Sequence, residues 1–154
     1  MKKLISLLLI ALMAMSLVAC GGKEDKLDAP LTDIMQAIVT DAVPADQLPM
    51  SLTEIEVTSD LAESFLGTSD IDYKEALAME PMMSSVAFSV VLVRMNDEAD
   101  VEDAMTKISS TINPRKWICV EAENVIVESR GDVILVVMAN EPAELIATAF
   151  NEYK

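Results

Sequence analysis

The chain has 154 residues and carries 26 acidic residues against 11 lysines and arginines, and it contains no histidine. Without histidine it has no Ser-His-Asp or Cys-His catalytic arrangement and no histidine-ligated metal site. Only four glycines are present, two of them at Gly21 and Gly22, which excludes a glycine-rich phosphate-binding loop.

The N-terminus has the pattern of a secretory signal peptide. Lys2 and Lys3 precede an apolar run, Leu4–Val18, that is broken only by Ser6 and Ser16. The run is shorter than the roughly 20 residues that span a bilayer, and a charged start before an apolar run is typical of a signal. We therefore assign residues 1–19 to a signal peptide.

The end of this run, Leu17-Val18-Ala19-Cys20, resembles the lipobox of bacterial lipoproteins. The resemblance implies a diacylglycerol on Cys20 and cleavage just before it; the alternative is an ordinary signal with an incidental cysteine. Two acyl chains anchor a protein durably, because each buried methylene contributes about 0.8 kcal/mol. We expect attachment through Cys20 to the outer face of the cytoplasmic membrane, with residues 20–29 forming the lipidated cysteine and a flexible polar tether.

The charge of the mature chain limits its partners. Cleavage after Ala19 leaves nine lysines and arginines against 26 acidic residues, a net charge of −17. Nucleic acid and anionic lipid headgroups repel such a surface, so we expect no nucleic-acid binding and no membrane contact besides the lipid. A basic or mixed-charge envelope protein, a cationic peptide or a metal ion is allowed. Residues 30–154 suffice for a single domain.

The domain begins with an amphipathic helix. Between Pro30 and Pro44, apolar residues recur at helical spacing, at Leu31, Ile34, Met35, Ile38, Val39 and Ala42. Leu52–Val57 alternates loosely, which is consistent with a short strand. Asp60 and Glu63 resemble a capping box before a short helix that Gly67 ends.

Two strands are expected in the middle of the chain. Tyr73–Met79 fits either a helix or an edge strand, of which we favour the strand, and Pro81 breaks it. In Val86–Met95 both sets of alternate positions are apolar, which predicts a strand at the centre of its sheet.

The C-terminal part alternates helices and strands. Asn96-Asp97 is expected to start a helix that Asn113-Pro114 ends, with a buried stripe of Val101, Ala104, Met105, Ile108 and Ile112. Strands lie within Trp117–Val127 and over Val133–Ala139, joined by a turn at Arg130-Gly131-Asp132. Asn140 is expected to cap a last helix whose stripe contains Ile146, Ala149, Phe150 and Tyr153.

This order predicts an α+β domain. We expect a mainly antiparallel sheet of about four strands with amphipathic helices packed on one face, preceded by an N-terminal helix. The lipobox, the tether, the acid-started helix and the hairpin "NVIVESRGDVILVVMAN" together resemble a small lipoprotein family of Gram-positive bacteria that carries a domain of unknown function. The resemblance implies the fold class and the anchor, and it brings no functional residues.

Four groups of residues are candidates for a site. Met79, Met82 and Met83 bracket Pro81 and are our candidate contact patch, because methionines make adaptable apolar surfaces; copper(I) ligation is the alternative. The acids over residues 97–103 and the pair Asp70 and Asp72 lack the spacing of a calcium loop. Cys119 lies between apolar neighbours and is expected to be buried. We interpret Arg130-Gly131-Asp132 as a turn and not as an adhesion motif.

We therefore expect a non-catalytic binding or protein-interaction module without metal or cofactor. The alternative is a carboxylate-based hydrolase that acts on cell-wall polymers, because two facing acids suffice for glycoside cleavage. Such an enzyme would need sugar-stacking aromatic side chains, for which the chain offers Tyr73, Trp117 and Tyr153.

Overall fold

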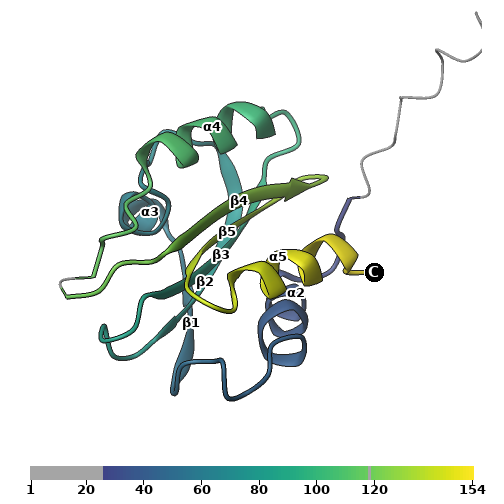
Figure 1. The fold of residues 1–154 in the computed structure, drawn as a ribbon. Helices are drawn as coiled ribbons and strands as arrows, with labels where there is room; N and C mark the ends of the chain where they lie inside the picture. Colours follow the sequence, from purple (N-terminus) through teal and green to yellow (C-terminus); the bar gives the residue numbers. More distant parts are fainter. Residues whose placement is uncertain (1–25, 118) are drawn as a thin grey trace, which may run out of the picture.

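A computed structural model describes residues 26–117 and 119–154, so Cys20 and the signal peptide lie outside the described residues. The elements follow one another as α2 (Leu31–Met35), η2 (Gln36–Asp41), β1 (Leu52–Glu56), α3 (Ser59–Leu66), β2 (Tyr73–Pro81), β3 (Phe88–Met95), α4 (Val101–Thr111), β4 (Asn124–Arg130), β5 (Val133–Ala139) and α5 (Ala143–Glu152) (Figure 1). The α+β class is as predicted.

The five strands form one antiparallel sheet in the order β1-β2-β3-β5-β4. β3 lies at its centre, as the apolar character of both its faces predicts. The count is roughly the four strands that we expected, and the fifth is β1, in the segment Leu52–Val57 that was only consistent with a strand. β2 pairs with β1 and with β3, so it is an interior strand and not an edge strand.

Helices cover both faces of the sheet, which corrects the expectation of helices on one face (Figure 1). Phe88, Val90 and Leu92 of β3 pack with α2, η2 and α5 in one core. Val91 and Val93, which point to the opposite face, pack with α3 and α4 in a second core. A central strand that is apolar on both sides needs a cover on both sides, and this is the physical reason for the correction.

The first helix widens after one turn into the π-helix η2. Its buried stripe follows the prediction from Leu31 to Val39, but Ala42 is exposed and Val43 is buried. Hydrogen bonds from residue i to i+5 put an extra residue into each turn, so the stripe moves on by one position.

Three helix starts differ from the sequence prediction. α4 starts at Val101 and not at Asn96-Asp97, because the side chain of Asp100 accepts a hydrogen bond from the Asp103 N–H at 3.0 Å. α3 has Thr58 at its N-cap and no side-chain cap, so the expected capping box is absent. Asn140 does not cap α5, since its side chain accepts from the Glu123 N–H at 3.1 Å.

Two glycines lie where the sequence predicts them, one at the end of a helix and one in a turn. Gly67 closes α3 with a φ of 76°, and a Cβ at this position would lie 2.5 Å from the carbonyl carbon of Thr111 at the end of α4. Gly131 has a φ of 56° at the first position of the two-residue turn between β4 and β5. Among the described residues, no helix is long and apolar enough to cross a membrane.

The last edge strand begins later than expected. β4 occupies only the end of the range Trp117–Val127 in which we expected a strand, and it continues to Arg130. Trp117, at the start of that range, is buried in the preceding loop against Ala87, Ala122 and Met138. The long connection from α4 to β4 therefore has a small core of its own, at the same end of the sheet as the loop between β2 and β3.

Candidate interaction site

The first residues that the structure describes pack against the sheet, near the C-terminal end of β3. The side chain of Leu27, which we assigned to the flexible tether, is buried in the core. Arg94 of β3 donates from Nη2 to the carbonyl oxygens of Leu27 and Ala29, at 2.7 and 2.6 Å. Residues 27–29, which we expected in the tether, thus pack with the domain.

Arg94 is also held from two other sides. Its guanidinium pairs with Glu75, and its Nε lies 3.8 Å from Oδ2 of Asp132. Only 11% of the Arg94 side chain is exposed, so these charges interact in a partly dry environment. One arginine fastens the first described residues to β3 and to the β4–β5 turn.

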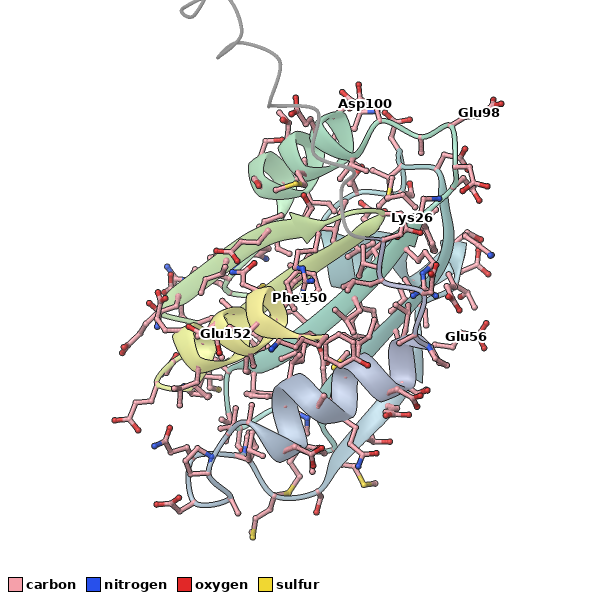
Figure 2. The ribbon with its side chains drawn as sticks, turned by 90° about the vertical axis from the view of Figure 1, so that its right-hand side faces the viewer. Lys26, Glu56, Glu98, Asp100, Phe150 and Glu152 are labelled. Carbon is pink, nitrogen blue, oxygen red and sulfur yellow. The ribbon has the colours of Figure 1, made fainter. Side chains whose placement is uncertain are left out.

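A second ion pair lies beside this arginine clamp. Nζ of Lys26 is 3.1 Å from Oδ1 of Asp97, and the hydrogen bond raises the pKa of Lys26 and lowers the pKa of Asp97. Both side chains are exposed, so the pair contributes little to stability. Figure 2 shows Lys26 at the same end of the molecule as Glu98 and Asp100.

The candidate contact patch differs from the one we predicted. Met79 lies on β2 with 7% of its surface exposed and belongs to the core, so the prediction is wrong for this residue. Met82 and Met83 are 76% and 66% exposed. Met50, which the sequence did not single out, is exposed as well. Val86, which we placed in a buried strand, precedes the start of β3 at Phe88 and is also exposed.

These four exposed residues come together because β1 pairs with β2. Leu52 opposes Pro81, and the Met82 N–H donates to the Ser51 carbonyl oxygen at 3.1 Å. Met50 therefore lies beside the β2–β3 loop although it is 32 residues away from Met82 in the sequence. We call Met50, Met82, Met83 and Val86 the methionine patch.

A hollow of about 270 Å³ adjoins the methionine patch. Val86 and Pro49 form part of its wall, Phe88 reaches it from β3, and Glu141 and Pro142 close it from the start of α5. Small-molecule sites usually enclose roughly 300–1,000 Å³, so this hollow is of a size for one or two inserted side chains.

The patch end of the sheet is poor in cations. Arg115 and Lys116 are the basic residues near it, and both are already paired, Arg115 with Glu121 and Lys116 with Glu80. Lys116 Nζ also lies 4.3 Å from the centre of the Phe65 ring. Three further acids, Asp46, Glu123 and Glu141, are exposed and form no ion pair within the described part of the chain.

The other acid-rich region lies at the opposite end. Asp70, Asp72, Asp100 and Asp103 line a hollow of about 360 Å³ together with Lys107. Hydrogen bonds to Asp70 and then to Asp103 raise the pKa of Lys107, whose Nζ lies 2.9 and 3.0 Å from these carboxylates. Within the ranges that the structure describes, no three Cys, Asp or Glu side chains are grouped to hold a metal ion.

The three candidate sugar-stacking aromatics do not line these hollows. Trp117 is buried in its small core. The Tyr73 hydroxyl donates to the Val57 carbonyl oxygen at 3.0 Å, and Tyr153 packs against the α2–α5 core. None of them lines the acid-rich hollow, which has no aromatic residue in its wall.

The two remaining sequence candidates have structural explanations. Arg130 donates to the carbonyl oxygens of Phe150 and Tyr153, and Asp132 faces Arg94, so the Arg130-Gly131-Asp132 turn is occupied by contacts within the domain. Cys119 is exposed in the loop before β4, which contradicts the expected burial. The buried side chain just before it is that of Trp117.

Comparisons with protein-family models, with curated proteins and with solved structures find no match. The family resemblance of the sequence pattern thus stays a prediction.

Proposed function

We propose that the protein is a lipid-anchored extracytoplasmic interaction module without catalytic activity, held through Cys20 to the outer face of the cytoplasmic membrane. One observation carries the proposal. Arg94 fastens the start of the described chain at one end of the sheet, and the methionine patch is exposed at the other end. The eight residues of β3 separate the two ends by about 24 Å.

This polarity suits a protein on a tether. A lipid anchor joined to the domain at the Lys26 end leaves the patch end facing away from the membrane, where an envelope protein can bind it. The net charge of −17 repels anionic headgroups and favours a basic or mixed-charge partner. The lipobox and the family resemblance support the same location.

The rival function is hydrolysis of cell-wall polymers by two carboxylates. The acid-rich hollow with Asp70 and Asp103 is the observation in its favour. Against it, Lys107 pairs with both of these acids, and the hollow has no aromatic side chain on which a sugar could stack. Turnover of purified wall glycan that is lost in Asp103→Asn would establish this activity and overturn our proposal.

Two measurements in cells test the proposal. Fractionation should show the parent protein with the membranes and Cys20→Ala in the soluble fraction or unprocessed. If the Cys20→Ala protein is processed normally and stays bound equally well, the anchor hypothesis is wrong.

A photo-crosslinking side chain placed at Met83 should capture an envelope protein, and the same side chain at Glu98 should not. Both positions are exposed, so they are matched in access and differ in the end of the sheet that they probe. Capture from Glu98 and not from Met83 would contradict the assignment of the interacting end.

A further inference from the structure

We propose that the patch end recognises a cationic amphipathic segment of a partner protein, whose apolar side chain enters the hollow beside Val86 while its lysines or arginines meet the unpaired acids around it. This inference rests on the proposed function and specifies the chemistry of the partner. It is carried by the geometry of the hollow, the composition of its rim and the exposure of the methionine patch.

The apolar part of the site combines a preformed hollow with an adaptable border. Val86 and Pro49 offer apolar surface within the hollow, and Phe88 beneath them is buried in the core of the sheet. Beside it, Met82 and Met83 extend into solvent on the β2–β3 loop. Flexible thioether side chains repack around different shapes, which suits a segment that inserts one side chain and lies across the rest.

The charged part of the site surrounds the apolar part. Glu141 lines the hollow directly, and Asp46 precedes Gln47, which also lines it. Glu123 is tied to the same rim, because its N–H donates to Asn140, another lining residue. Glu141 also lies just before α5, where a negative charge offsets the partial positive charge of the helix start.

The same charges argue against other occupants. A second copy of the chain would bring two equal sets of unpaired acids together, which repel one another. An anionic membrane surface is repelled for the same reason and lies at the opposite end of the sheet in the proposed orientation. At about 270 Å³ the hollow lies below the roughly 300–1,000 Å³ that is typical of sites for drug-sized molecules.

The test measures binding of three short peptides to the full chain purified in a neutral detergent. The first, acetyl-Lys-Lys-Leu-Phe-Lys-Lys-amide with a fluorescent label, should bind saturably and more weakly as salt rises from about 50 to about 300 mM. The second replaces every lysine with glutamate, and the third replaces Leu-Phe with Ser-Ser. Neither of these should bind detectably at a concentration of about 1 mM.

Variants assign the binding to the patch end. Glu141→Gln should weaken binding about threefold, as expected for one exposed charge pair. Met82→Ser combined with Met83→Ser should weaken it about tenfold. Glu98→Gln removes an exposed acid at the other end of β3 and should leave binding unchanged, because the length of β3 is about three screening lengths. Unchanged melting temperatures confirm that each variant is folded.

Each contrary result overturns the inference in a distinct way. Equal effects of Glu141→Gln and Glu98→Gln would show attraction by overall charge alone. Equal binding of the Leu-Phe and Ser-Ser peptides would remove any role of the hollow. Absence of saturable binding by the first peptide, when crosslinking in cells still succeeds from Met83, would refute this partner chemistry and leave the proposed function intact.

Discussion

Replacing Arg94 with methionine tests whether the start of the domain depends on one buried cation. The substitution keeps the unbranched stem, which contributes apolar contacts, and removes the guanidinium. Arg94 Nη2 donates to the carbonyl oxygens of Leu27 and Ala29, and Nε faces Asp132. We expect Arg94→Met to free residues 26–29 from the sheet and to lower the free energy of unfolding.

The magnitude follows from these contacts. Hydrogen bonds that involve a charged group contribute roughly 1.5–3 kcal/mol each, so the two carbonyl contacts give a gross value of roughly 3–6 kcal/mol. The freed carbonyls can bond to water, and Glu75 is about half exposed, so its pair adds little. We expect a net loss of about 3 kcal/mol, which lowers the melting temperature by about 10 °C for a domain of this size.

Arg115→Met is the matched control. Arg115 has 75% of its side chain exposed and forms a single ion pair with Glu121, so the same substitution should cost less than about 0.5 kcal/mol. Calorimetry measures both melting temperatures, and amide hydrogen exchange should accelerate over residues 27–31 in Arg94→Met alone. If the two variants melt within about 2 °C of each other, Arg94 does not hold the chain as described.

Three further results are expected from the packing of the domain. Val90→Asp or Leu135→Asp should each cost several kcal/mol in denaturant unfolding, because both side chains are fully buried and a buried unpaired charge is strongly unfavourable; unchanged melting of both variants would contradict the core assignment. Gly67→Ala should cost about 2–4 kcal/mol in the same assay, because Gly67 has a left-handed φ and the added Cβ would lie 2.5 Å from the backbone of Thr111. Gly131→Ala should cost only about 1 kcal/mol, for the left-handed φ alone, and equal costs would refute the clash at Gly67. Burial raises the pKa of Tyr73 above the ordinary tyrosine value of about 10. The stability that the neutral Tyr73 side chain contributes is therefore present below about pH 10 and is lost as the pH rises through the higher pKa of the folded state. A pH titration of the free energy of unfolding should show this alkaline loss in the parent and a smaller loss in Tyr73→Phe.

The central part of the fold could be predicted because its signals are local. Alternating apolar residues on both sides of Val86–Met95 indicate a central strand, and β3 is central. The same observation implies a cover on both faces, which our expectation of helices on one face overlooked. Helix starts are less predictable, since Asn96, Asp97 and Asp100 are all acceptable caps and the choice depends on which of them has another partner.

The candidate site could be predicted only in part, because residues distant in the sequence build it. Alternation along β2 explains why Met79 points into the core, and the end of that strand explains why Met82 and Met83 do not. Nothing local connects them with Met50, which arrives through the pairing of β1 with β2. The hollow adds a third distant segment, the start of α5.

The Arg94 contacts and the methionine patch lie at opposite ends of the sheet, which bears on how the proposed tether would orient the domain. A flexible tether alone leaves every face of a domain equally able to meet the membrane. Here residues 27–29 are fixed to β3 by Arg94, so a tether of the kind that we propose would leave the domain from one defined point at the Lys26 end. Repulsion between the acidic surface and anionic headgroups opposes rotation of the domain onto the bilayer. With attachment at the Lys26 end, as proposed, the methionine patch at the other end of the sheet faces away from the membrane.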